Sequence, residues 1–211
     1  MPVIDLSHTI APSMPVYPGT PAPSVAPART VREDGHLEHA IALHTHVGTH
    51  VDAPAHLLED GDTLDGVALE RFAGRAIVVD ARSASDGRIT QDRIAAERTR
   101  LVDVDIVLLW TGWSARWGTP GYLEGFPCLD EAAARWLVDR GVRGLGVDTI
   151  SVDPMAADPL AVHHALLDRG AIIIENLTGL DVLPRDPFLF VALPLKIAGG
   201  DGSPVRAAAF T

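Results

Sequence analysis

The segment His46-Val-Gly-Thr-His50-Val-Asp52-Ala-Pro-Ala-His56 combines imidazoles, a carboxylate, a glycine and a proline, and it constrains the fold more than any other stretch. Because His44 precedes it, four of the nine histidines lie close to Asp52 in the sequence. Neutral imidazole nitrogens and a carboxylate oxygen are ligands that borderline divalent cations prefer, and an aspartate can bridge two ions. The segment therefore predicts a metal site, and the simpler alternative is a histidine-rich polar strand edge.

The spacing of these residues requires a bend in the chain. In a straight strand, His46 and His50 would lie about 13 Å apart, whereas ligand atoms lie about 2 Å from the zinc ion they share. The pair Gly48-Thr49 stands between them, and glycine tolerates the backbone angles of a sharp bend. Beyond the bend, His50 and Asp52 project to the same side if the chain is extended.

A second group of candidate ligands lies downstream. His163 and His164 fall on a predicted helix over residues 160–168, and Glu175 ends the apolar run 171–174. A carboxylate at the end of a buried strand is unfavourable unless it is paired, hydrogen-bonded or bound to a cation. Active sites of α/β folds gather at the carboxyl ends of strands, although Glu175 could also simply reach solvent there.

The hydrophobic pattern predicts one α/β domain over residues 1–211, with a mixed sheet and flanking helices. Its first 30 residues are rich in proline and are expected to form an extended arm or ordered loop. Residues 37–47 alternate and predict a half-buried strand that presents histidines on its polar face. The other predicted strands cover 3–6, 75–80, 105–111, 143–148, 171–175, 188–193 and 205–210, and the helices cover 90–100, 130–138 and 160–168, with Thr90 and Asp130 as N-caps.

The composition excludes several classes of protein. A formal net charge of −11, from 17 Lys+Arg and 28 Asp+Glu, argues against nucleic acid and anionic membranes as partners. Cys128 is the only cysteine, so neither an intramolecular disulfide nor a thiolate zinc site is expected. The chain shows no signal-peptide pattern and no apolar run long enough to span a bilayer. These features predict a cytoplasmic protein.

The pattern His46-x-Gly48-Thr49-His50-x-Asp52-x-Pro54-x-His56 resembles the signature of the cyclase family of metal-dependent hydrolases, to which bacterial kynurenine formamidases belong. The resemblance continues in order along nearly the whole chain. The further segments that carry it are Val16-Tyr17-Pro18-Gly19, Gly146-Val-Asp-Thr149, Ser151-Val-Asp-Pro154, His163-His164, Glu175-Asn176, Leu193-Pro-Leu-Lys196 and Ser203-Pro-Val-Arg206.

This resemblance implies a swivelling β/β/α fold, a homodimer or homotetramer, and one or two Zn²⁺ or Mn²⁺ ions per subunit. The site residues it implies can be carried over by position. His46, His50 and Asp52 match the ligands of the first metal, and Asp52 also contacts the second, whose other ligands match His163 and Glu175. His56 matches the proton donor and acceptor, Tyr17 matches an aromatic residue that contacts substrate, and His44 is left as a surface or supporting residue.

The expected activity is metal-dependent hydrolysis of a small amide, formamide or cyclic amide, with His56 as general acid and base. One specific alternative is N-formylkynurenine formamidase activity. Another alternative is a cupin-like metal dioxygenase or isomerase, because His44-Thr-His46 resembles part of such a site. A third is a metal-binding protein without catalytic activity. A serine nucleophile is disfavoured, because Gly112-Trp-Ser-Ala-Arg116 lacks the second glycine of a nucleophile elbow.

Overall fold

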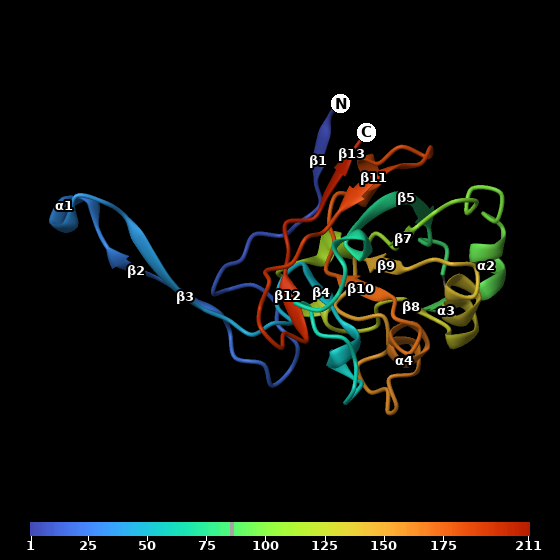
Figure 1. Cartoon of the computed structure of the whole chain (residues 1–211), viewed down its shortest axis with the longest axis horizontal. Coiled ribbons are helices and arrows are strands. Elements are labelled where there is room, and N and C mark those ends of the chain that lie inside the picture. Colours follow the sequence, from blue (N-terminus) through green and yellow to red (C-terminus); the bar gives the residue numbers. More distant parts are fainter. Residues whose placement is uncertain (85–86) are drawn as a thin grey trace.

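A curled mixed sheet of nine strands forms the centre of the computed structural model, which describes residues 1–84 and 87–211 (Figure 1). The strand order is β1-β13-β11-β5-β7-β9-β10-β4-β12, with parallel pairing from β5 to β10 and antiparallel pairing towards both edges. The strands are β1 (Val3–Asp5), β4 (His50–Asp52), β5 (Ala73–Asp80), β7 (Ile106–Trp110), β9 (Gly144–Val147), β10 (Ile172–Glu175), β11 (Phe188–Val191), β12 (Gly202–Pro204) and β13 (Ala208–Phe210). This architecture confirms the predicted α/β domain with a mixed sheet.

The central strands carry apolar side chains on both faces, and both faces are buried. Along β10, Ile173 packs in one apolar layer with side chains of the helices, whereas Ile172 and Ile174 pack in a second layer with Leu6 and Phe190. Successive side chains of a strand point to opposite faces, so a strand that is covered on both sides reads as a continuous apolar run. The same parity directs the side chain of Glu175 to the face that carries Ile173.

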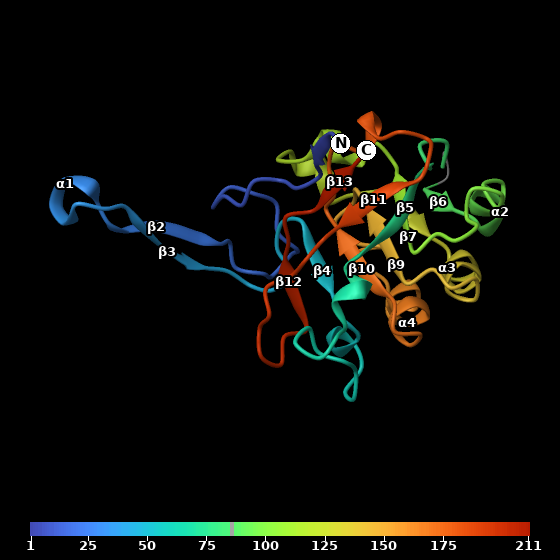
Figure 2. The same cartoon turned by 45° about the horizontal axis from the view of Figure 1, so that its top comes forward.

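Three helices lie together on one side of the molecule: α2 (Gln91–Ala95), α3 (Glu131–Val138) and α4 (Ala161–Leu167) (Figures 1 and 2). The predicted caps are confirmed, because the side chains of Thr90 and Asp130 accept hydrogen bonds from the first turns of α2 and α3. A two-stranded parallel sheet of β6 (Arg88–Ile89) and β8 (Cys128–Leu129) packs beside them. The helix predicted over residues 90–100 is shorter than expected: α2 ends at Ala95, and residues 96–100 form turns.

A two-stranded ribbon extends away from the body of the molecule (Figures 1 and 2). It pairs β2 (Ser24–Arg29) with β3 (Glu38–Ala42), and the short helix α1 (Val31–Asp34) forms its tip; residues 24–42 are called the arm below. The prediction of a half-buried strand over residues 37–47 is therefore wrong in both its length and its burial. The strand ends at residue 42 and all five residues of β3 are exposed, because its alternation reflects pairing with β2 rather than packing on a core.

The proline-rich stretch expected to form an arm over residues 1–30 overlaps this ribbon only in part. Within residues 1–30, strand β1 pairs with β13 in the main sheet, and Met14 is buried. Pro27 lies in β2, where the register shifts before Arg29, as expected for proline in a two-stranded edge. None of the helices in the described ranges is long and apolar enough to cross a membrane.

The pairing of β4 with β10 positions the predicted metal-binding segment. The two strands are antiparallel, with Asp52 opposite Ile173 and His50 opposite Glu175. Because cross-strand partners project to the same face, the side chains of His50, Asp52 and Glu175 all point towards the layer that contains α4.

Candidate metal centre

The predicted bend before β4 is confirmed. Gly48 adopts a left-handed conformation with φ of 63°, and His50 to Asp52 then run as a fully buried strand. Pro54–His56 form a single 3-10 turn that begins with proline. The bend brings the ring of His46 back beside β4, and the turn directs His56 towards the same place.

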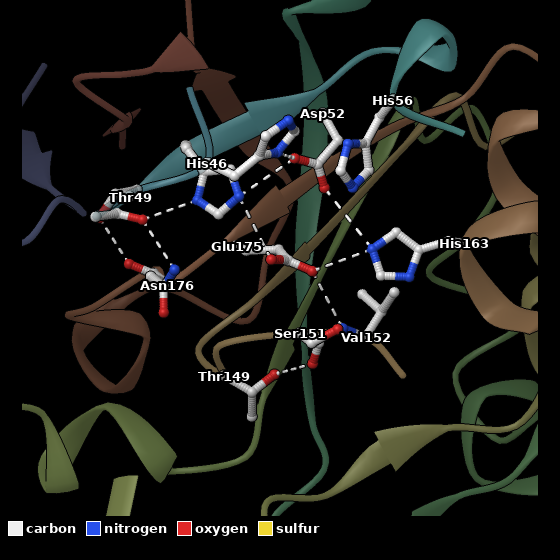
Figure 3. Close-up of polar contacts among 12 residues, drawn as sticks. His46, Thr49, Asp52, His56, Thr149, Ser151, Val152, His163, Glu175 and Asn176 are labelled. Carbon is white, nitrogen blue, oxygen red and sulfur yellow. Dashed lines mark hydrogen bonds and ion pairs between the residues drawn. The ribbon is translucent and has the colours of Figure 1, made fainter. Parts of the chain in front are cut away.

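Five predicted ligands converge on one point. On one side, Asp52 Oδ1 lies 2.6 Å from His46 Nδ1 and 3.2 Å from His50 Nε2. On the other side, Asp52 Oδ2 lies 4.0 Å from His163 Nε2. Glu175 spans both halves, with one oxygen 3.4 Å from His50 Nε2 and the other 3.5 Å from His163 Nε2. Figure 3 shows Asp52, Glu175 and His163 pointing towards one another from β4, β10 and α4.

Each of the three histidines presents one ring nitrogen to the cluster and hydrogen-bonds through the other. His46 Nε2 lies 2.8 Å from Asp201 Oδ2, and His163 Nδ1 lies 2.8 Å from Asp153 Oδ2. His50 Nδ1 lies 2.9 Å from the carbonyl oxygen of Gly48. An outer acceptor of this kind fixes the tautomer and orientation of a ligating imidazole. The nitrogens left facing the cluster are His46 Nδ1, His50 Nε2 and His163 Nε2.

The carbonyl of Gly48 is itself held by Asn176, which follows Glu175. Asn176 Nδ2 donates to Gly48 O at 2.8 Å, and Asn176 Oδ1 accepts from the hydroxyl of Tyr122 at 2.7 Å. Thr49 Oγ1 donates to the carbonyl of Asn176 at 2.6 Å. Asn176 adopts a positive φ of 56°, which asparagine tolerates better than most residues. These bonds tie the bend to the end of β10.

The electrostatics of the cluster show the influence of its buried carboxylates. Burial alone would lower the pKa of His46, but Asp52 and Asp201 outweigh burial and raise it to about 9. Burial would also lower the pKa of His163, but Asp153, Glu175 and Asp52 raise it to about 10. Burial would raise the pKa of Asp52, but His50 and His46 hold it well below its usual range. The cluster therefore attracts positive charge strongly.

The residues fit a divalent cation. Asp52 Oδ2 is buried and has no hydrogen-bond partner among the described residues, which is unusual for a buried polar atom. Ligand atoms from His46, His50 and Asp52 lie within 4.8 Å of one another, as do those from Asp52, His163 and Glu175. A donor set of nitrogen and oxygen without thiolate suits zinc or manganese.

A cavity of about 340 Å³ opens onto this cluster. Its polar lining includes His46, His50, His163 and Glu175, and its remaining walls are largely apolar. The cavity is also lined by His56 and by Tyr17, whose hydroxyl donates to the carbonyl of Met155 at 3.3 Å. Two other histidines are placed elsewhere: His44 is exposed at the base of the arm, and His164 lies 3.7 Å from Asp168 on the outside of α4.

Three residues that contact the cluster were not identified from the sequence as candidates. Asp153 and Asn176 lie within segments that resembled the family, but no spacing rule pointed to them. Asp201 lies in the glycine-rich turn before β12, which was expected only to connect two elements. The only sequence signal was the presence of a carboxylate or amide in such a turn, which is common in surface loops.

A methyl group at residue 202 should displace His46. A Cβ added to Gly202 would lie 2.5 Å from Cε1 of His46, so the ring must shift from its present position beside Asp52. We expect Gly202→Ala to weaken Mn²⁺ binding by at least about tenfold in a calorimetric titration. Gly66→Ala is the matched control, because its Cβ would approach no atom closer than 3.4 Å. Equal affinities of Gly202→Ala and wild type would show that His46 is not a ligand.

The metal-free protein should lose stability at alkaline pH. The pKa values of His46 and His163 are raised to about 9 and about 10, from 6.5. Their stabilising charge pairs are therefore fully present below about pH 6.5 and are lost as the pH rises through about 9 to 10. We expect the melting temperature with EDTA to fall over this range. With Mn²⁺ it should fall less, because the cation replaces the protons. Parallel pH dependences with and without metal would contradict this account.

The comparison with known proteins agrees with this geometry. The sequence profile of the Cyclase family matches residues 4–154. The kynurenine formamidase of Salinibacter ruber (strain DSM 13855 / M31) is 35% identical over 214 residues, which cover 98% of this chain and 96% of that protein.

Two solved structures are also similar. An isatin hydrolase bound to the product analogue thioisatinate has a TM-score of 0.91 at 25% identity, covering 99% of this chain and 92% of that chain. A predicted metal-dependent hydrolase from Bacillus stearothermophilus has a TM-score of 0.81 at 32% identity, covering 99% and 97% of the two chains. The profile match over most of the chain and the full-length relatives together show that this protein belongs to the Cyclase family.

Proposed function

We propose that the protein hydrolyses the amide bond of a small aryl formamide or cyclic aryl amide with the help of a bound divalent metal. The relatives include a kynurenine formamidase and an isatin hydrolase, and the chain is accordingly a hydrolase of carbon–nitrogen amide bonds. The observation that carries the proposal is the buried cluster around Asp52, whose residues line a cavity. Within the described part of the chain, Asp52 Oδ2 has no hydrogen-bond partner.

The ligands divide into two sets that share Asp52. His46 and His50 with Asp52 would hold one cation, and His163 and Glu175 with Asp52 would hold a second. The donor atoms support Zn²⁺ or Mn²⁺, with one or two ions per subunit. Elemental analysis of protein purified without added metal measures both the identity and the number of these ions. A fully active protein that contains no metal would overturn the proposal.

A bound cation of this kind lowers the pKa of water towards neutrality and polarises a carbonyl oxygen. The residues of the chain supply orientation and proton transfer. Burial lowers the pKa of His56, so its imidazole is neutral at pH 7 and can accept a proton. As the water oxygen bonds to the carbonyl carbon, His56 takes a proton from that water. It returns the proton to the leaving nitrogen as the carbon–nitrogen bond breaks, which yields a carboxylic acid and an amine.

The walls of the cavity support a small aromatic substrate. The apolar part of the cavity lining consists of Leu57, Ile150, Pro154 and Leu160. A volume of about 340 Å³ lies at the lower end of the range for small-molecule sites. Tyr17 contributes an aromatic ring at the cavity, and we propose that it contacts the substrate. N-formylkynurenine and isatin-like lactams both fit this description.

Replacement of His56 separates catalysis from metal binding. We expect His56→Ala to retain bound metal and to lose about 10²- to 10⁴-fold in kcat on its best substrate. The assay compares N-formylkynurenine, simple aryl formamides and isatin by product absorbance. His164→Ala is the control, because this histidine lies on the outside of α4. Near-normal turnover by His56→Ala would remove its role as acid and base.

Two other interpretations are less well supported. A cupin-like dioxygenase or isomerase would need His44 beside His46, but His44 is exposed and lies outside the cavity lining. Oxygen uptake with substrate would favour it. A metal-binding protein without activity would be expected to lack part of the site, whereas all five ligands and His56 lie together. An absence of turnover across the substrate panel with metal bound would favour that interpretation.

We also propose that two or four copies of the chain associate, and that the arm contributes to the contact. Val31, Leu37 and Ile41 on the arm are 66%, 60% and 61% exposed, and an isolated two-stranded ribbon is marginally stable by itself in water.

A cytoplasmic location also stays a prediction, which cell fractionation tests.

Charged substitutions on the arm should therefore change the oligomeric state. We expect the double variant Leu37→Asp and Ile41→Asp to shift the mass measured by light scattering from a dimer or tetramer towards a monomer, because buried apolar contacts between copies would be lost. Val102→Asp, at a residue that is 63% exposed on the body, is the control. A monomeric wild type would contradict the proposal.

A further inference from the structure

Asp201 lies between two histidines that have different predicted roles. Its Oδ2 atom is 2.8 Å from Nε2 of the predicted ligand His46 and 3.7 Å from Nδ1 of the predicted acid and base His56. The two rings are neighbours, with centroids 3.9 Å apart and planes inclined by 34°. A single carboxylate oxygen therefore lies near both imidazoles, within hydrogen-bond distance of His46 and slightly farther from His56.

The backbone around Asp201 is fixed to the ligand strand. The carbonyl of Asp201 accepts a hydrogen bond from the amide of Ala53 at 2.9 Å, and Gly202 pairs with Asp52 in the register of β12 and β4. Gly200 accepts from the amide of Leu64 at 2.8 Å. The position of the carboxylate is thus coupled to β4, although its side chain is 42% exposed. Such a fixed backbone limits the directions from which Asp201 can approach the rings.

On the basis of the proposed function, we infer that Asp201 is a positioning residue for two side chains, the predicted metal ligand His46 and the predicted acid and base His56. Its carboxylate accepts the Nε2 proton of His46 and so leaves the Nδ1 lone pair directed at the metal position. The same oxygen attracts the Nδ1–H side of the His56 ring, which leaves the Nε2 atom of His56 as the nitrogen that exchanges protons with water and substrate. Because one oxygen serves both rings, the ligand and the acid and base keep a constant relative position.

Asp153 provides an internal comparison. It approaches His163 in the same way that Asp201 approaches His46, at 2.8 Å from a ring nitrogen. Asp153 also accepts from the backbone amides of Val162 and His163 at the start of α4. In the part of the chain that the structure describes, Asp153 makes no hydrogen bond or ion pair with His56, whose ring centroid lies 6.0 Å from that of His163. Asp153 is therefore expected to affect metal binding alone.

A different arrangement would also bring these groups together. Ligand atoms of His46, His56 and Asp201 lie within 4.8 Å of one another, as they would if Asp201 bound a separate ion. We favour the positioning role because His46 Nε2 lies at ordinary hydrogen-bond distance from Asp201 and because its Nδ1 already faces Asp52. An imidazole that bound two ions at once would have to lose both ring protons.

The test compares Asp201→Asn with Asp153→Asn in the full-length protein. Glu59→Gln is the control for charge, because Glu59 is an exposed carboxylate in the loop that follows His56. Calorimetric titration with Mn²⁺ gives the affinity and the number of ions without substrate. Steady-state assays at saturating Mn²⁺ then give kcat and KM on the best substrate of the wild type.

We expect both aspartate variants to bind Mn²⁺ about 10- to 100-fold more weakly than wild type, as found when partners of ligating histidines are removed. At saturating Mn²⁺, Asp153→Asn should recover kcat to within about threefold, whereas Asp201→Asn should stay at least about tenfold lower with little change in KM, because His56 is no longer oriented. Glu59→Gln should match wild type in Mn²⁺ affinity, number of bound ions, kcat and KM.

Two results would overturn the inference. The first is an Asp201→Asn variant that recovers kcat at saturating Mn²⁺ as Asp153→Asn does. The second is a variant that loses one full equivalent of Mn²⁺ and keeps wild-type affinity for the rest, since Asp201 would then be a ligand of a separate ion. A wild type that binds no metal would instead refute the proposed function, so the two failures are distinguishable.

Discussion

The burial of Asp52 and Glu175 beside three imidazoles is the constraint on which the rest of the site depends. Both carboxylates lie below the surface, at 1% and 5% exposure. Burial of an uncompensated charge costs on the order of several kcal/mol. Positive charge must therefore lie close by, either on protonated histidines or on a cation. Carboxylate neighbours raise the pKa values of His46 and His163, and Asp52 Oδ2 has no hydrogen-bond partner among the described residues.

The sheet is arranged so that this requirement can be met. The parallel strands β5, β7, β9 and β10 form the apolar centre, and the carboxyl end of β10 carries Glu175. The short strand β4 adds to β10 in the opposite direction, which places His50 and Asp52 next to Glu175 on the same face. Helix α4 then covers that face and contributes His163. Predicted ligands from three elements thus meet because the strand register and the helix position agree.

Support for the ligands comes from segments that have no metal-binding pattern of their own. Asp153 precedes α4 and also caps it, Asp201 precedes β12, and Asn176 follows β10. Each holds a predicted ligand, either through the ring nitrogen that faces away from the cluster or through the backbone. The precision of the cluster therefore depends on the ends of secondary-structure elements, where backbone and side-chain polar groups are both available.

The sequence by itself determined the local features of this protein. The spacing of His46, His50 and Asp52 required the bend at Gly48, the apolar runs marked the central strands, and Thr90 and Asp130 marked the helix starts. Only the tertiary structure decided that residues 38–42 leave the body in an exposed arm and that Asp201 faces His46 and His56. The reason is physical: periodicity and spacing record how a segment packs on its nearest neighbours, whereas contacts between segments far apart in the chain depend on strand order and register.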